Sequence, residues 1–175
     1  MTETPLEDLP LPDGKLAFLS SSEAAMVLDL YGRCRDYFLL QDGEAAGAPD
    51  AEALFTDVPP SKGSEDQLVI GYWRDGKLMG VAALLRHYPN ETDWYLGFLL
   101  LDPSIRRRGL GRTIYKAIER WSAQRGARRM LLAVLDCNDT ALEFWRALGF
   151  KAVRTVEASA FKSKLHVRQE LVRQL

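Results

Sequence analysis

Two apolar segments on either side of an amphipathic helix constrain the fold of this chain more than any other feature. "YLGFLLL" (95–101) and "RMLLAVL" (129–135) are continuous apolar runs of the kind that form buried strands. The segment between them, "IYKAIERWSAQRG" (114–126), has apolar residues at helical spacing. Its predicted core face consists of Ile114, Ala117, Ile118 and Trp121, and Gly126 is its predicted C-cap. Because a helical crossover joins strands that run in the same direction, the two strands are predicted to be parallel.

The strands around this unit predict a mixed sheet. Upstream, "QLVIGYW" (67–73) and "LMGVAALLRHY" (78–88) flank an Asp-Gly hairpin turn, and a second turn leads into the strand at 93–101. These three strands form an antiparallel meander. Downstream, two more strands are predicted near 152–157 and 164–172. The antiparallel meander and the parallel pair together indicate the α/β (α+β) class.

The N-terminal part of the chain predicts helices and loops. A short strand at 15–20 is followed by a helix that begins at the serine caps of residues 20–22 and runs to Leu40. The predicted buried face of this helix includes Met26, Leu30, Cys34 and Tyr37. A second short helix is predicted at 50–58. We expect one domain over residues 15–175, preceded by a flexible leader at residues 1–14.

Cysteine and histidine usage predicts neither a disulfide framework nor a metal site. Cys34 and Cys137 are far apart in the sequence, and His87 and His166 are isolated, so no metal-ligand spacing occurs. This usage favours a reduced, cytoplasmic protein. The acidic, proline-containing N-terminus does not resemble a signal peptide, and no apolar run approaches the roughly 18 residues of a membrane span.

The charges divide unevenly along the chain. Residues 1–66 carry 14 acidic and 4 basic side chains, whereas residues 67–175 carry 10 acidic and 19 basic ones. One interpretation is an uneven surface without a specific partner. The other is a site at which the C-terminal half binds a polyanion and the N-terminal half binds a cation.

The segment "SIRRRGLGRT" (104–113) lies between the apolar strand and the amphipathic helix. A helix N-terminus exposes unpaired amides and the positive end of the helix dipole, and Gly109 and Gly111 would let a phosphate approach the backbone. A dinucleotide fingerprint is excluded because its third glycine would fall at Ile114, and a P-loop is excluded by the absence of Gly-Lys-Ser/Thr. A solvated basic turn and a nucleic-acid patch remain alternatives, although no exposed aromatics are interleaved with the arginines.

Two motifs in this sequence resemble the GNAT superfamily of N-acetyltransferases. The first is Arg106-x-x-Gly109-x-Gly111, which matches the superfamily's acyl-CoA-binding signature. The second is "NDTALEFWRALGF" (138–150), a predicted short helix ended by Gly149. The positions of this second element that match are Asn138, Ala141, Phe144, Gly149 and Phe150.

The resemblance implies a twisted, mostly antiparallel sheet flanked by helices, with its parallel pair splayed around a CoA cleft. It implies an enzyme that transfers the acetyl group of acetyl-CoA to a primary amine of a small molecule or peptide, by direct attack in a ternary complex and without a metal. The backbone of three strand residues would bind the pantetheine arm, and the amides of residues 107–112 would bind the pyrophosphate. The cofactor-binding residues so implied are Leu99, Leu100, Leu101, Arg106, Arg107, Arg108, Gly109, Leu110, Gly111, Arg112, Asn138, Ala141, Phe144 and Trp145.

The catalytic residues match the superfamily less well. Trp145 stands where many members have a tyrosine that protonates the leaving thiolate, and indole cannot act as that acid. Tyr95 stands at the register of the frequent glutamate base and is the candidate catalytic residue, relaying a proton through water or capping the sheet edge. Asp93 would share its face of the strand. Cys137 would lie close to the cleft, but a lone cysteine at such a position is more often a small buried residue than a catalytic one.

The acidic N-terminal half suggests a cationic amine as acceptor. Asp29, Asp36, Asp42 and Glu44 would favour a polyamine, an aminoglycoside or a basic peptide terminus. We expect no nucleic-acid or membrane partner, and the exposed sheet edges are compatible with a homodimer. A CoA-binding sensor or scaffold without catalysis is the main alternative, because of Trp145 and the missing glutamate, and a nucleic-acid-binding module is the weaker one.

Overall fold

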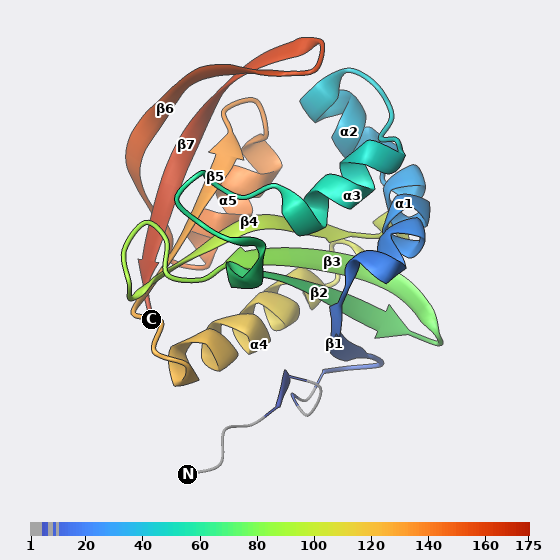
Figure 1. Cartoon of the computed structure of the whole chain (residues 1–175), viewed down its shortest axis with the longest axis horizontal. Coiled ribbons are helices and arrows are strands. Elements are labelled where there is room, and N and C mark those ends of the chain that lie inside the picture. Colours follow the sequence, from blue (N-terminus) through green and yellow to red (C-terminus); the bar gives the residue numbers. More distant parts are fainter. Residues whose placement is uncertain (1–4, 7–8, 10) are drawn as a thin grey trace.

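The computed structural model describes residues 5–6, 9 and 11–175 and contains one seven-stranded mixed sheet with five α-helices (Figure 1). The order of strands across the sheet is β1-β2-β3-β4-β5-β7-β6. The strands are β1 (Lys15–Leu19), β2 (Gln67–Arg74), β3 (Lys77–Leu85), β4 (Asp93–Leu101), β5 (Arg129–Leu135), β6 (Lys151–Phe161) and β7 (Lys164–Gln174). The helices are α1 (Ala24–Arg33), α2 (Arg35–Asp42), α3 (Ala48–Thr56), α4 (Leu110–Gln124) and α5 (Asp139–Ala147). Only β4 and β5 pair in parallel, so the predicted fold class is confirmed.

Helices cover both faces of the sheet and bury a separate apolar cluster on each. On one face, α4 and α5 pack against the sheet around Trp94, Ile118 and Trp121. The four predicted core residues of α4 are all buried. On the other face, α1 and α3 pack over β2, β3 and the second half of β4, with Leu30 and Tyr31 in the centre of the cluster. The sheet is therefore the middle layer of three.

The parallel pairing of β4 with β5 is short, and the two strands separate where it ends. The two strands pair only over Asp93–Tyr95 and Arg129–Leu131. β4 then continues along β3 to Leu101, whereas β5 continues along β7 to Leu135. The register between β3 and β4 shifts at Gly97, which has no partner residue and forms a β-bulge. Beyond this bulge, the edge of β4 that faces β5 has no partner strand among the described elements.

An ion pair holds the closed end of this parallel pair. Asp93 and Arg129 are the first residues of β4 and β5 and lie opposite each other. The Arg129 guanidinium donates two hydrogen bonds to the Asp93 carboxylate, at 2.7 and 2.6 Å. Asp93 is only 1% exposed, and its hydrogen bonds from Arg129 hold the pKa of this carboxyl below its usual value despite burial. The strands are thus fastened at the point from which they diverge.

The helix predicted to run to Leu40 is two helices. The backbone leaves helical geometry at Cys34, with φ −97° and ψ 32°, so α1 ends there and α2 begins. Of its predicted buried face, Met26 is 50% exposed, whereas Leu30 and Cys34 are fully buried. Val27, three residues before Leu30, is buried in place of Met26.

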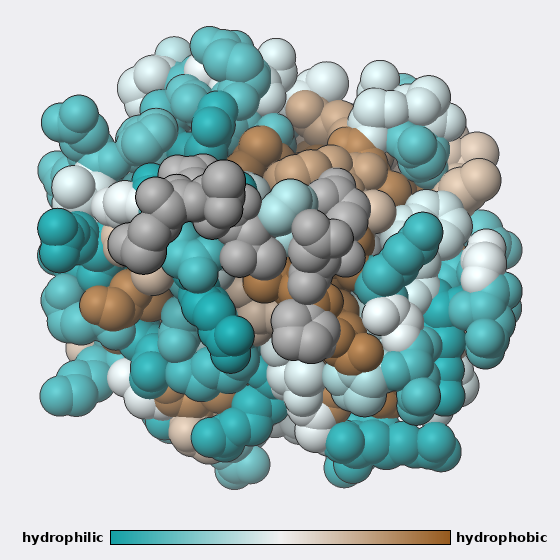
Figure 2. Space-filling view, turned by 90° about the horizontal axis from the view of Figure 1, so that it is seen from below, coloured by the Kyte–Doolittle hydropathy of each residue, from teal (hydrophilic) through white to brown (hydrophobic). Residues whose placement is uncertain are grey.

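Part of the predicted leader contributes to the core. Leu6 and Leu9 are buried in the same cluster as Trp94, and the Tyr72 hydroxyl donates a hydrogen bond to the Pro12 carbonyl at 3.1 Å. Figure 2 shows the molecule from below, relative to the view of Figure 1. Apolar residues lie towards the centre of this face, and hydrophilic residues surround them. Within the part of the chain that the structure describes, no helix combines the length and the apolar character that a membrane span requires.

We predict that Arg129→Gln destabilises the fold in a pH-dependent way. Because the pKa of Asp93 is lowered in the folded state, its pairing stabilises the fold fully above the ordinary carboxyl pKa of 3.8, and this stabilisation is lost as the pH falls below that value and through the lowered pKa of the folded state. Urea midpoints should therefore differ between variant and wild type at pH 7, and the difference should shrink below about pH 4.

Arg154→Gln is the matched control. Arg154 also binds a carboxylate with two hydrogen bonds, to Glu170, but its side chain is mostly exposed, and exposed ion pairs contribute little. Equal urea midpoints for the two variants at pH 7 would contradict the role given to Arg129.

Candidate active site

The free edge of β4 presents backbone groups at alternate residues. The Asp102 amide donates to the Met79 carbonyl at 2.8 Å, which continues the β3–β4 ladder by one pair. In an antiparallel ladder only every second pair exchanges hydrogen bonds, so Leu100 bonds to β3 while Leu99 and Leu101 turn their backbone groups to the opposite edge. Of the three leucines predicted to bind pantetheine, Leu99 and Leu101 are therefore the ones whose backbone faces away from β3.

The start of α4 carries a run of amides without acceptors. No hydrogen-bond acceptor for the amides of residues 107–112 occurs among the described residues, and the first intrahelical bond is from the Thr113 amide to the Gly109 carbonyl. Arg107 and Gly109 both have positive φ, at 60° and 79°. Alternation of left-handed residues with others turns successive amides towards one point, and the helix dipole adds positive potential there. We call these residues the anion nest (residues 107–112).

The arginines of the motif have two different roles. The Arg106 side chain donates to the Leu101 carbonyl at 2.7 Å and to Asp36 of α2 at 2.6 Å, so it fixes α2 against the end of β4. Burial opposes charge on Asp36, but Arg106 outweighs it and lowers the pKa of this carboxyl. Arg107, Arg108 and Arg112 are exposed and form no ion pair with the described residues. These three arginines are available to attract an anion.

Gly111 lies where β4, α4 and α5 meet. A Cβ atom placed on Gly111 would be 3.5 Å from the side chains of both Leu101 and Phe144, which is ordinary contact. Leu110, Ala141 and Phe144 are partly buried against the core cluster below this point. The fold therefore brings the two sequence motifs, about 30 residues apart, into contact beside the open edge of β4.

Two residues of the second motif have structural roles. The Asn138 side chain accepts a hydrogen bond from the Ala141 amide at 3.1 Å, so Asn138 is the N-cap of α5. Trp145 is 7% exposed and packs edge-on against Tyr115, Phe144 and Phe150 with ring centroids 4.8 to 5.3 Å apart. Both positions were predicted to line the CoA cleft, and in the structure Asn138 caps α5 while Trp145 packs into the core beneath it.

Tyr95 is the last residue of β4 that pairs with β5. Its ring packs against Tyr88 at 5.8 Å, and burial raises the pKa of its hydroxyl to about 12. The phenol therefore stays protonated at neutral pH and can donate a hydrogen bond. Asp93 is not available to exchange a proton with Tyr95, because Arg129 and Asn90 donate hydrogen bonds to both of its carboxylate oxygens.

Most of the carboxylates expected to attract a cationic acceptor are already paired. Asp29 binds Arg33, Asp36 binds Arg106, and Glu44 lies 3.3 Å from Lys162. Asp42 is buried at the end of α2, and burial raises the pKa of its carboxyl. The carboxylates of the N-terminal half thus contribute less free negative charge than their number indicates.

The fold also brings together side chains that sequence spacing could not connect. Asp136 and Cys137 follow β5, and His166 lies in β7, yet their ligand atoms lie within 4.8 Å of one another. The pairing of β5 with β7 produces this proximity. A separate hollow of about 690 Å³ lies at the β1 edge of the sheet, lined in part by Lys15, Trp73 and Gly76, and none of the predicted site residues lines it.

A model of the acetyltransferase (GNAT) family matches residues 26–150. The chain belongs to this family. The family expected from the two motifs is thus confirmed, and membership of it implies acetyl-CoA as the acyl donor. Among curated relatives, aminoglycoside N(6')-acetyltransferase type 1 of Salmonella typhimurium is 32% identical over 88 residues, which is 47% of this chain and 61% of that protein. The chain therefore spans less than two thirds of that relative's length.

Solved structures share the fold over nearly the whole chain. An acetyltransferase from Thermus thermophilus has a TM-score of 0.73 with 24% identity, covering 94% of this chain and 99% of that one. The ribosomal-protein-S18-alanine N-acetyltransferase from Escherichia coli has a TM-score of 0.70 with 15% identity, covering 92% and 93%. At these identities the likeness establishes the fold alone.

We predict that Gly109→Asp abolishes CoA binding, reducing affinity by about 100-fold or more, because a carboxylate would enter the anion nest and several charge-assisted hydrogen bonds would be lost. Arg107→Ala should weaken binding only about 3- to 10-fold, since its charge is exposed. Isothermal titration with CoA measures both.

Gly76→Asp is the control for backbone strain. Gly76 has φ 74°, close to the 79° of Gly109, and both positions are open to a side chain. Gly76 also lines the hollow at the β1 edge, so its variant tests whether CoA binds there instead. Unchanged affinity in Gly109→Asp, or an equal loss in Gly76→Asp, would contradict the assignment of the nest.

Proposed function

We propose that this chain is an acetyl-CoA-dependent N-acetyltransferase that acetylates a primary amine by direct attack in a ternary complex. The observation that carries the proposal is the adjacency of the anion nest to the free edge of β4. The nest would bind the pyrophosphate of CoA, with Arg107, Arg108 and Arg112 adding attraction. The backbone groups of Leu99 and Leu101 would bind the pantetheine arm in the manner of an added strand. Leu101 offers its amide, because its carbonyl already accepts from Arg106.

Acetyl transfer from a thioester needs a neutral amine, a stabilised oxyanion and a proton for the leaving thiolate. Holding donor and amine in line can supply on the order of 7–11 kcal/mol of the barrier, so few acid–base groups are required. In this chain the fixed divergence of β4 and β5 supplies the positioning. Tyr95 lies at the apex of that divergence as a protonated donor, and it would act on the reacting groups through a hydrogen bond or a bridging water.

The acceptor is proposed to be a primary amine of a small molecule or peptide. The Salmonella relative, named as an aminoglycoside acetyltransferase, supports an amino sugar as one candidate. Asp36 and Glu44 would contribute little to the binding of such a polycation, because Arg106 and Lys162 neutralise these carboxylates within the fold. A cytoplasmic location, the absence of a nucleic-acid partner and a homodimeric form remain parts of the proposal that rest on the sequence.

A CoA-binding protein without catalysis is the second candidate. It is favoured by Trp145, because the position that many superfamily members use for the thiolate's proton donor is here an aromatic residue of the core. This candidate predicts tight CoA binding without turnover.

We predict turnover of acetyl-CoA with at least one amine of a panel containing an aminoglycoside, a diamine and a peptide with an N-terminal alanine. Release of free thiol, followed with a chromogenic disulfide reagent, measures the rate. Gly109→Asp should be inactive, and Gly76→Asp should retain wild-type activity. CoA binding by calorimetry without thiol release for any amine would support the sensor and contradict the transferase.

We predict that Tyr95→Phe lowers kcat by about 100-fold, the lower range of a positioned proton donor, without changing the Kd of CoA. The pH profile of the wild type should show no ionisation from this residue between pH 6 and 9, since the pKa of its hydroxyl is about 12. Tyr88→Phe is the control, because the ring of Tyr88 packs against Tyr95 and its substitution tests packing alone. Equal kcat values for Tyr95→Phe and wild type would exclude Tyr95 from catalysis.

A further inference from the structure

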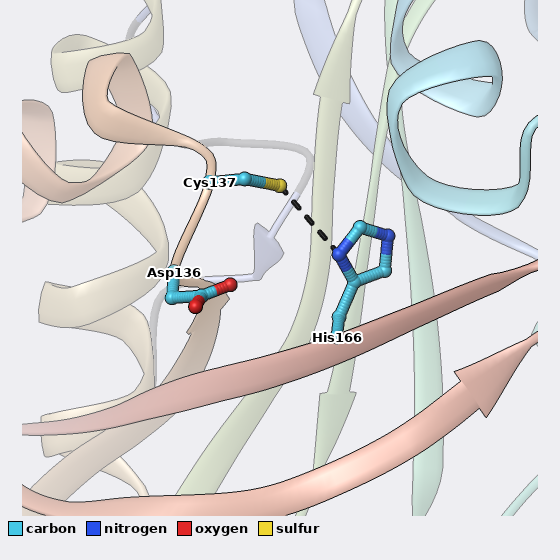
Figure 3. A group of neighbouring side chains, drawn as sticks. All are labelled: Asp136, Cys137 and His166. Atoms are coloured by element: carbon cyan, nitrogen blue, oxygen red, sulfur yellow. Dashed lines mark hydrogen bonds between the residues drawn. The ribbon is translucent and has the colours of Figure 1, made fainter.

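Three side chains of metal-ligating type converge beside the end of β5 (Figure 3). Asp136 and Cys137 lie in the turn between β5 and α5, and His166 reaches them from β7. The Cys137 sulfur points at the imidazole, and the two atoms Sγ and Nδ1 are 3.6 Å apart. Asp136 and Cys137 are exposed, whereas His166 is buried. The group is therefore open to solvent on one side and held by the protein on the other.

The buried side of His166 fixes its tautomer. Its Nε2 lies 2.8 Å from the carbonyl oxygen of Gln41, at the end of α2. A carbonyl only accepts hydrogen bonds, so Nε2 carries a proton, and in the neutral imidazole Nδ1 then presents its lone pair to Cys137. A metal-bound histidine usually donates its other N–H to a carboxylate or a backbone carbonyl, which orients the ring. Gln41 already provides that contact.

The distances suit a tetrahedral zinc ion. Zinc binds sulfur at about 2.3 Å and imidazole nitrogen at about 2.0–2.1 Å, so tetrahedral geometry places the two ligand atoms about 3.5–3.6 Å apart. The Sγ–Nδ1 separation of 3.6 Å agrees with this distance. The carboxylate of Asp136 is exposed, and its oxygen lies within 4.8 Å of both atoms. Rotation of that one side chain would complete a third ligand.

We propose that Asp136, Cys137 and His166 form a site for Zn²⁺ with three protein ligands and one position open to water. Thiolate, imidazole and carboxylate together select a borderline-soft ion over Mg²⁺ or Ca²⁺. Binding displaces the thiol proton to solvent as the Zn–S bond forms. The site shares no residue with the anion nest. It differs from the metal-free protein expected from the sequence, because β5–β7 pairing, and not spacing, assembles it.

The metal would fasten one wall of the cleft. Cys137 directly precedes Asn138, the N-cap of α5, while His166 is hydrogen-bonded to α2 through Gln41. A bound ion would therefore link the β5–α5 turn to β7 and, through His166, to α2. The other cysteine offers no competing site, since Cys34 is buried, donates to the Leu101 carbonyl, and has its pKa raised to about 11 by burial.

Cobalt(II) titration of the full chain, purified without a histidine tag and stripped with a chelator, tests the proposal. Co²⁺ replaces Zn²⁺ and reports a thiolate ligand by a charge-transfer absorption band in the near ultraviolet. We expect this band to saturate at one Co²⁺ per chain, to disappear on addition of Zn²⁺, and to persist in excess Mg²⁺. Zn²⁺ should also raise the melting temperature by about 5 °C at 100-fold excess over its Kd.

Single substitutions test which side chains bind the metal. Cys137→Ser should abolish the band, and His166→Gln should weaken cobalt binding at least 10-fold. Asp136→Asn should weaken it less, since an amide oxygen can still coordinate. Cys34→Ser and His87→Gln change the other cysteine and the other histidine and should leave the band unchanged. Circular dichroism in chelator confirms that each variant is folded.

Two results would overturn the proposal. The first is absence of a saturable thiolate band in the wild type, which would leave Cys137 and His166 as a hydrogen-bonded pair only. The second is a band that survives in Cys137→Ser or is lost in Cys34→Ser, which would place the metal elsewhere.

Discussion

The early end of the β4–β5 pairing is the constraint on which the rest of this molecule depends. Asp93 and Arg129 bind each other where the strands meet, and three residues later the pairing stops. The bulge at Gly97 changes which side chains of β4 face each layer, so Trp94 packs under α4 while Phe98 packs against α1 and α2. The separation frees one edge of β4, and everything proposed for the cleft uses that edge or the helix that follows it.

The arginines that hold the fold together near the cleft are different from the groups that are proposed to bind the anion. Arg33 and Arg106 bind Asp102, Asp36 and backbone carbonyls at the end of β4, and so they position α1 and α2. We propose that the anion is recognised by backbone amides, which cost no side-chain entropy to hold in place. This arrangement explains why a glycine-rich turn, and not a cluster of basic side chains alone, precedes α4.

Local pattern in the sequence predicted the elements well, and contacts between distant segments were not predictable. The strand at 93–101, the parallel pair and the core face of α4 follow from periodicity and a helical crossover. The break at Cys34 was missed, because that residue continues the apolar spacing while its thiol bonds to Leu101 in a distant strand. One feature of the sequence could have predicted the β-bulge, namely the single glycine, Gly97, within the strand. The cluster at Cys137 and His166 had none, since only β5–β7 pairing creates it.

Residue-specific amide shifts in the NMR spectrum of the 19.7 kDa chain test the central claim most directly. Adenosine diphosphate should shift the amides of residues 107–112, and phosphopantetheine should shift Leu99 and Leu101. CoA should shift both sets and leave Asp75 and Gly76 unchanged. Shifts concentrated at the β1 edge, with the amides of residues 107–112 unaffected, would contradict the account.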